Sequence, residues 1–260
     1  MEGRRRPAGP LYVVEHMEEG LEEWCRLEYR HICQIIPPER VVFLRFPSDV
    51  DAASLAPSVS NAVSVPPRTE VGRLDELVAC GPAVEEGKAP SDVSMNGPPL
   101  PTWERICLLD MDAEEALEPD DAKRFDALVF GGILGNVIEN EDGSYGSDDR
   151  TSELRKLGFT NRRHLGPLQM TTDTAVLACR LVLEEGRPLA EIPFIDSPEI
   201  SEAPAADAKM EGEGPADSVC MEGFRYVARR GADGGWAPDL PEGMRELLLR
   251  SADDDILGSL

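Results

Sequence analysis

The stretch FDALVFGGILGN, residues 125–136, decides the fold and the position of the candidate site. Its apolar run ALVF is short and uninterrupted, as expected for a strand buried on both faces of a parallel sheet. The run ends at Gly131 and Gly132, and Gly135 follows three residues later. Glycine permits positive φ angles and lets backbone N–H groups approach a ligand closely. The spacing fits neither GxGxxG nor GxxxxGK[ST], so these glycines predict either a ligand-binding turn or only a tight connection.

A second stretch, RHLGPLQMTTDTA at 163–175, supplies the polar start of a helix. Thr and Asp are preferred N-cap residues because their side chains accept hydrogen bonds from the free N–H groups of the first turn. The segment that follows, AVLACRLVLEE at 175–185, is apolar almost all round, which predicts a buried helix. A polar helix start beside a glycine turn favours a pocket rich in backbone donors, with a purely structural cap as the alternative.

The composition limits the class of partner. The 260 residues include 41% hydrophobic ones, enough for one large domain or two small ones. The net charge is −24, from 26 basic and 50 acidic side chains, and basic residues cluster only at 4–6 and 162–164. Nucleic-acid binding draws on Lys and Arg contacts to phosphates, so this charge favours a basic protein partner over RNA. The alternative interpretation is that acidic insertions serve solubility.

Cysteine and histidine usage indicates neither disulfides nor a metal site. The six cysteines are scattered without a CxxC pair, and the three histidines show no metal-ligand spacing. No apolar stretch follows the basic residues at 4–6 as a signal peptide requires, and no window approaches the 18 apolar residues of a membrane span. We therefore expect a protein of a reducing, cytoplasmic compartment with no bound metal.

Alternation of strand and helix patterns predicts the fold class. Short apolar runs at 11–14, 41–46, 106–109 and 127–130 alternate with helical patterns, the longest at 21–36. This order predicts an α/β domain with a parallel sheet flanked by helices. Further strands are expected at 159–164, 188–195 and 224–228, with a closing helix at 242–251.

Three segments interrupt this order and are predicted to be irregular or disordered insertions in a single domain, 1–260. They span residues 48–102, 137–148 and 201–220, and are rich in proline, glycine or acidic residues. Within the first of them only residues 70–79 have a helical pattern.

An acidic loop, EHMEE at 15–19, follows the first predicted strand. In an open α/β sheet ligands gather beyond the carboxyl ends of the strands, so Glu15, Glu18 and Glu19 are candidate site residues. The alternative is an acidic first helical turn, which the helix macrodipole favours.

Taken together, four motifs resemble the SPOUT-class methyltransferases. They are FDALVFGGILG, RHLGPLQMTTDTA, DRTSELR at 149–155 and FIDSPEI at 194–200. Within that class, the sequence is similar to the eukaryotic protein arginine methyltransferases best known from yeast, which modify a ribosomal protein of the small subunit. The likeness extends to VEHMEEGLEEW at 14–24, FRYV at 224–227 and LPEGM at 240–244, and so to both ends of the chain.

The resemblance implies a SPOUT fold with a C-terminal deep trefoil knot at about 129–198, although chains are generally unknotted. It also implies a monomer that binds S-adenosylmethionine through the three loops FGGILG, HLGPLQMTT and FIDSP. The cofactor-binding residues carried over from these loops are Gly131, Gly132, Leu134, Gly135, Asn136, Leu165, Gly166, Gln169, Met170, Thr171, Thr172, Thr174 and Ile195.

An arginine acceptor would need carboxylates. Its guanidinium is a planar cation with no free lone pair until a proton leaves, and a bidentate carboxylate orients it and balances its charge. We expect Glu15, Glu18, Glu19 and Asp173 to supply these carboxylates as catalytic residues, with His16 as a weaker candidate base.

Two alternatives remain open. One is an RNA methyltransferase of the same fold, whose substrate would be repelled by an acidic cluster. The other is an inactive adaptor that binds the cofactor. The family commonly has an aspartate and a Pro-Pro turn after FGGILG, where this chain has Asn136 and an acidic insertion.

Overall fold

The computed structural model describes residues 9–56, 66–78, 100–132, 137–139, 145–147, 151–201, 218–231 and 234–258. Six strands form one sheet in the order β3-β2-β1-β5-β4-β8, and all neighbouring pairs are parallel. These strands are β1 (Leu11–His16), β2 (Val41–Leu44), β3 (Arg68–Thr69), β4 (Ile106–Leu109), β5 (Ala127–Gly132) and β8 (Arg162–Arg163). The predicted parallel sheet is confirmed, with β5 beside β1 at its centre.

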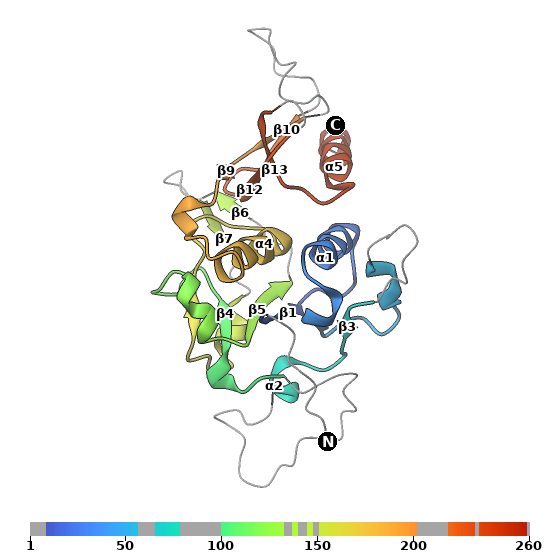
Figure 1. The fold of residues 1–260 in the computed structure, drawn as a ribbon. Coiled ribbons are helices and arrows are strands. Elements are labelled where there is room, and N and C mark those ends of the chain that lie inside the picture. Colours follow the sequence, from blue (N-terminus) through green and yellow to red (C-terminus); the bar gives the residue numbers. More distant parts are fainter. Residues whose placement is uncertain are drawn as a thin grey trace, which may run out of the picture.

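Helices cover both faces of this sheet. On one face, α1 (Glu23–Ile35) and α4 (Thr172–Leu183) pack side by side (Figure 1). On the other face lie α2 (Leu74–Leu77) and α3 (Thr151–Arg155), whose leucines join a second core cluster. α1 buries Cys25, Tyr29 and Ile32 because residues four and then three apart share one side of a helix.

The C-terminal part of the chain adds antiparallel structure that the sequence patterns did not predict. β9 (Phe194–Asp196), β12 (Arg225–Arg230) and β13 (Trp236–Pro238) form a sheet in the order β13-β12-β9. β10 (Glu199–Ser201) pairs with β11 (Ser218–Cys220), and α5 (Met244–Gly258) packs against both. As Figure 1 shows, α1 and α4 lie between the six-stranded sheet and this C-terminal part.

The segments predicted to be irregular contain regular elements where they are described. Residues 48–102 include a short 3-10 helix, Ala52–Leu55, together with β3 and α2. Leu55 and Leu74 are fully buried, so apolar residues scattered among prolines still enter the core. Residues 137–148 include an antiparallel pair, β6 (Val137–Glu139) with β7 (Tyr145–Ser147), and β11 lies within 201–220. Residues predicted as strand at 188–191 instead include a 3-10 helix, Leu189–Glu191, which begins after Pro188.

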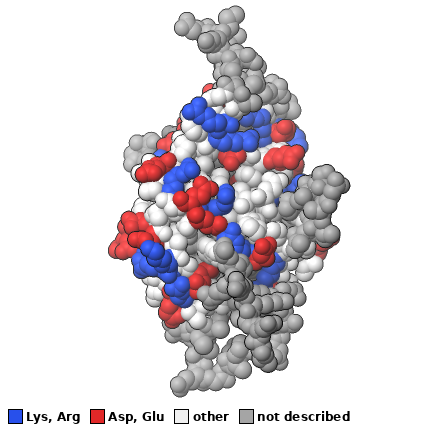
Figure 2. Space-filling model, viewed as in Figure 1, with Lys and Arg blue, Asp and Glu red and all other residues white. Residues whose placement is uncertain are grey.

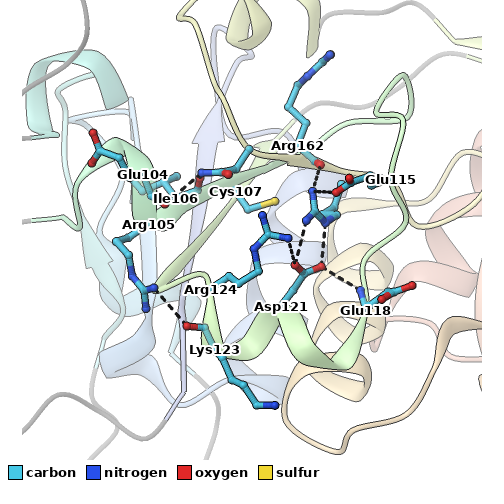
Figure 3. Close-up of polar contacts among 12 residues, drawn as sticks. Glu104, Arg105, Ile106, Cys107, Glu115, Glu118, Asp121, Lys123, Arg124 and Arg162 are labelled. Atoms are coloured by element: carbon cyan, nitrogen blue, oxygen red, sulfur yellow. Dashed lines mark hydrogen bonds and ion pairs between the residues drawn. The ribbon is translucent and has the colours of Figure 1, made fainter.

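A buried ion pair fixes the edge strand β8 and the loop that follows it. Arg163 donates from Nε to Asp121 Oδ2 at 2.9 Å and from Nη2 to Asp121 Oδ1 at 3.1 Å. Its Nη1 lies 2.8 Å from Glu115 Oε2. In Figure 3, dashed lines join the carboxylates of Asp121 and Glu115 to one guanidinium. Arg163 and Asp121 are both buried. Of the basic residues clustered at 162–164, Arg163 is therefore used inside the fold and is not available to a partner.

Candidate functional site

The strands β1 and β5 end side by side, and Gly132 is needed there for packing. A Cβ atom on Gly132 would lie 2.2 Å from the Tyr29 hydroxyl and 2.7 Å from Val14 Cγ1. The Gly132 carbonyl accepts a hydrogen bond from the backbone N–H of Met17 at 3.2 Å. The glycine thus lets α1 approach the strand end closely. The next residues of the predicted cofactor loop, Leu134, Gly135 and Asn136, lie outside the described residues.

The loop 164–171 approaches this strand end from β8. Gly166 has a φ of +118°, which favours glycine, and its N–H donates to His164 Nδ1 at 3.1 Å. Leu165 and Met170 are half-buried against the main core. The Gln169 carbonyl accepts from the backbone N–H of Arg225 at 2.8 Å, which ties the loop to β12. Gln169 Oε1 is buried, and no described residue donates to it.

The start of α4 is linked to both the glycine strand end and α1. The Thr172 hydroxyl donates to the Gly131 carbonyl at 3.3 Å. The predicted N-cap differs, because the Thr171 hydroxyl donates to Thr174 Oγ1 at 2.8 Å and makes no cap hydrogen bond. Instead the carboxylate of Glu28, from α1, accepts from the backbone N–H of Thr172. A carboxylate from another helix thus takes the place of the local cap.

Glu28 and Asp173 form a buried acidic pair, with exposed fractions of 3% and 1%. Trp24 Nε1 donates to Glu28 Oε1 at 2.5 Å, and His31 Nδ1 lies 2.7 Å from Asp173 Oδ2. Burial, and then the negative charge of Asp173, raise the pKa of Glu28 well above its ordinary value. Among the described residues, no Lys or Arg forms an ion pair with either carboxylate.

Two polar atoms of this cluster lack a partner. Asp173 Oδ1 and the hydroxyl of Tyr226 are both buried, and nothing in the described part of the chain hydrogen-bonds to either. Burial, and then the negative charges of Asp173 and Glu28, raise the pKa of Tyr226. Its ring belongs to the apolar cluster on which Trp24 packs, Trp24 donates to Glu28, and β12 contacts α4. Ile195 lies opposite Tyr226 in the β9–β12 ladder, so the FIDSP loop borders the same place. We name Glu28, Asp173 and Tyr226 the acidic cluster.

The structure does not bring Glu15 to this cluster. β1 continues to His16, two residues beyond the predicted strand, and side chains alternate between the faces of a sheet. Val13 belongs to the core of the α2 face, and Glu15 points the same way, where its Oε2 accepts from the backbone N–H of Leu74 at 3.1 Å. Burial raises the pKa of Glu15 to about 7. Glu15 and Asp173 therefore lie on opposite faces.

His16 points to the α1 face, but both ring nitrogens are engaged there. Nε2 lies 3.2 Å from the Gly20 carbonyl, and Nδ1 lies 2.9 Å from the Tyr29 hydroxyl. A carbonyl only accepts, so Nε2 carries the proton and Nδ1 accepts from Tyr29. Burial lowers the pKa of His16, which keeps the ring neutral. In the turn that follows, Glu18 is half-buried and Glu19 is exposed.

Sequence reasoning missed Glu28 and Tyr226. A signal for Glu28 exists, because Trp24, Glu28 and His31 are spaced four and then three residues apart and share one side of α1. Tyr226 carried no comparable signal, since only the antiparallel β9–β12 pairing brings it over α4. In the part of the chain that is described, no group of three or more His, Cys, Asp or Glu residues could hold a metal ion. No described helix is long and apolar enough to cross a bilayer.

Comparisons with known proteins identify the family. The family model "Protein arginine N-methyltransferase SFM1-like" matches residues 11–255. Protein arginine N-methyltransferase SFM1 of Saccharomyces cerevisiae is 32% identical over 252 residues, which cover 95% of this chain and 99% of the yeast protein. The crystal structure of yeast arginine methyltransferase SFM1 complexed with SAM matches with a TM-score of 0.66 and 29% identity, over 94% of this chain and 92% of that one. The complex of the same enzyme with SAH matches with a TM-score of 0.62 and 30% identity, over 92% and 94%. This chain belongs to the SFM1-like family of protein arginine N-methyltransferases.

Proposed function

We propose that this protein transfers a methyl group from S-adenosylmethionine to an arginine side chain of a basic protein. The observation that carries the proposal is the buried acidic cluster, which has unpartnered acceptor atoms and no internal cation among the described residues. It lies beside the glycine end of β5, since Thr172 contacts both Gly131 and Glu28. An acceptor site for a cation next to a cofactor loop is what arginine methylation requires.

The described residues of the loop 164–171 fit the methyl donor. Gly166 opens the backbone, Leu165 and Met170 offer apolar walls, and the buried Gln169 Oε1 is an acceptor for an N–H or hydroxyl group. S-adenosylmethionine supplies a methyl group that its sulfonium has already activated. The solved yeast relatives carry SAM or SAH, which supports the same cofactor here. The residues proposed to hold it remain Gly131, Gly132, Leu134, Gly135, Asn136, Leu165, Gly166, Gln169, Met170, Thr171, Thr172, Thr174 and Ile195.

A basic protein is favoured over RNA as the substrate. The net charge of −24 attracts a cationic partner and repels phosphates. On the face drawn in Figure 2, one group of Lys and Arg lies in the upper part, over the C-terminal strands, and others alternate with Asp and Glu lower down. Two exposed arginines of β12 have partners there: Arg229 lies 3.4 Å from Asp239, and Arg230 stacks on Trp236. We propose a small-subunit ribosomal protein as the substrate, a cytoplasmic location and a monomer.

The test is incubation with labelled S-adenosylmethionine and, separately, purified small-subunit ribosomal proteins or rRNA. We expect label in a protein, and methylarginine after hydrolysis. Label in RNA alone would contradict the proposal and favour the RNA methyltransferase. Calorimetry with the unlabelled cofactor completes the experiment. Tight binding with label in neither substrate would indicate the inactive adaptor.

A further inference from the structure

Among the described residues, the acidic cluster lacks the Arg partner that several other buried carboxylates have. Arg163 neutralises Asp121, and Arg162 neutralises Asp110 with Nη1 2.9 Å from Oδ2. In the described part of the chain, the donors within reach of Glu28 are the Trp24 indole N–H and the hydroxyl and backbone N–H of Thr172, none of them charged, and Asp173 contacts only His31. An unpaired buried carboxylate costs several kcal/mol, so the fold retains this pair at the expense of stability.

The unpartnered atoms suit a planar cation with several N–H donors. Asp173 Oδ1 is an acceptor, and the Tyr226 hydroxyl can also accept. Both are buried, and Tyr226 responds to the charge of both carboxylates. A guanidinium presents five N–H donors in a fixed planar arrangement. An ammonium group, with all its donors on a single nitrogen, could contact only some of these acceptors. The cluster therefore fits arginine better than lysine.

We infer that Glu28, Asp173 and Tyr226 together hold the guanidinium of the substrate arginine, and that Glu28 accepts the proton this group loses on methylation. This assignment rests on the proposed function and adds two residues, Glu28 and Tyr226, to the predicted Asp173. In the step, an N–C bond forms while the C–S bond of the sulfonium breaks, and its electron pair stays on sulfur. One N–H bond of the arginine breaks, and its proton passes to the Glu28 carboxylate.

Glu28 suits the role of proton acceptor because of its surroundings. The neighbouring titratable groups are Cys25, Tyr29 and His31 on α1, Asp173 on α4 and Tyr226 on β12. They include a second carboxylate and no Lys or Arg of the described chain, so Glu28 holds a proton readily. Binding of a cationic guanidinium favours the ionised form of Glu28, so Glu28 releases its proton on binding. It is then a carboxylate when the methyl group is transferred.

Entry to the cluster passes His31. Its side chain is 12% exposed, whereas that of Asp173 is 1% exposed, so His31 is the more accessible member of the pair. The imidazole occupies Asp173 Oδ2, one of the two oxygens that a guanidinium would bind bidentately. The arginine therefore displaces His31 from this oxygen as it enters.

A purely structural role competes with this assignment, because Glu28 also accepts the N–H at the start of α4. Tyr226 separates the two interpretations. Its hydroxyl has no partner among the described residues, so Tyr226→Phe should leave the fold intact. If the cluster is purely structural, this variant should also leave arginine binding and activity unchanged. Glu28→Gln keeps an acceptor for Thr172 but removes the charge. Glu22→Gln is the matched control, since Glu22 is exposed at the start of the same helix and its side chain makes no cap hydrogen bond.

The experiment compares these full-length variants by two readouts. The first is binding of N-acetyl-arginine amide, with N-acetyl-lysine amide as the comparison, by calorimetry in two buffers of different ionisation enthalpy. We expect arginine amide binding that releases protons and tightens as pH rises, about tenfold weaker binding in Tyr226→Phe, and no proton release in Glu28→Gln. The second is kcat/KM on small-subunit ribosomal proteins against pH, which should fall about 100- to 1,000-fold and lose its acid limb in Glu28→Gln. Glu22→Gln should match the wild type in both.

The outcomes separate this inference from the proposed function. A wild type that methylates protein, with Glu28→Gln and Tyr226→Phe equal to Glu22→Gln, would overturn the inference and leave the function standing. Arginine amide that binds no better than lysine amide would overturn it as well. Loss of S-adenosylmethionine affinity in the variants, parallel to the loss of activity, would assign the cluster to the cofactor instead. If the wild-type protein labels no protein substrate, that result contradicts the proposed function itself, and with it the inference.

Discussion

Two sets of buried carboxylates on the α1–α4 side of the molecule differ in whether the fold supplies them with a cation. Asp121 receives both arms of the Arg163 guanidinium, at 2.9 and 3.1 Å, and joins the 3-10 helix Pro119–Lys123 to the edge strand β8. Glu28 and Asp173 lie close enough to repel one another, and among described residues neither has a Lys or Arg partner. Both groups are buried from solvent.

The difference indicates what each group is for. The Asp121 carboxylate is stabilised by a cation from the fold itself, because an isolated buried charge is costly. A carboxylate pair without such a cation avoids that cost either by holding a proton, as Glu28 does, or by binding a cation from outside. Strain of this kind is typical of functional sites, where stability is exchanged for binding. Arginine is thus the partner in both places, supplied internally in one and by the substrate in the other.

The largest expected effect tests the first half of this comparison. Asp121→Ala removes the partner of a buried arginine and should lower the free energy of unfolding by about 3–5 kcal/mol. Asp120→Ala is the control, because Asp120 pairs with Lys123 in solvent and its loss should leave the free energy of unfolding nearly unchanged. Denaturant titration measures both. Equal, small effects would contradict a structural role for the Asp121–Arg163 pair.

Glu15 is a third buried carboxylate, without an ion pair among the described residues, and it should respond to pH. Its folded pKa of about 7 lies above the ordinary 4.5, so its contribution to stability is present below about pH 4.5 and is lost as pH rises through 7. Glu15→Gln avoids this loss and should be more stable than the wild type at pH 8, by up to about 3 kcal/mol. Thermal unfolding at pH 5 and pH 8 checks it. A variant that is less stable at both pH values would assign Glu15 a positive role as a charge.

Asp173→Asn tests the second half of the comparison. We expect it to lower activity without lowering stability. Removing one of two like charges relieves repulsion on Glu28, so the free energy of unfolding should stay the same or rise by about 1 kcal/mol. Activity should fall about 100-fold, because the guanidinium loses a charged partner. Unfolding and initial rates at pH 7.5 measure the two effects. A loss of several kcal/mol would place Asp173 with Asp121, as a structural carboxylate.

The smallest effect is expected at the exposed acidic turn. Glu19→Ala should raise the KM for a basic protein about two- to threefold at low salt, with kcat unchanged, because an exposed charge acts on association. Glu39→Ala is the matched control, since Glu39 is exposed just before β2, at the amino ends of the parallel strands, whereas Glu19 lies beyond their carboxyl ends. The difference should vanish at high salt. A change in kcat would bring Glu19 into contact with the reacting groups.

Much of the parallel sheet could be predicted from local patterns. The strand runs at 11–14, 41–46, 106–109 and 127–130 are continuous apolar segments, and each lies in or overlaps a strand of the sheet. The antiparallel C-terminal strands could not be predicted to pair. β9 and β12 are separated by more than twenty residues, and partners at that distance carry no local signal. The trefoil knot implied by the resemblance stays a prediction.

The candidate site could be predicted only in part. Asp173 and the strand end at Gly131 are adjacent through Thr172, as the two motifs suggested. Glu15 was grouped with Asp173 because the predicted strand ended at residue 14, and two more residues of strand turn its side chain to the other face. Glu28 was missed because a glutamate on an amphipathic helix usually faces water, and only the packing of α4 and β12 over α1 buries it.

One contact made by α1 links the two halves of the site mechanically. The Tyr29 hydroxyl fills the space where Gly132 lacks a side chain, and the residue before it in the helix is Glu28. Consecutive residues of a helix are offset by roughly 100° and 1.5 Å, a separation that hardly varies. The position of the Glu28 backbone relative to the strand end at Gly132 is therefore fixed through two adjacent residues of one helix. A methyl or larger group at the tip of β5 would push the whole helix outward and misalign the reaction without touching either reactant.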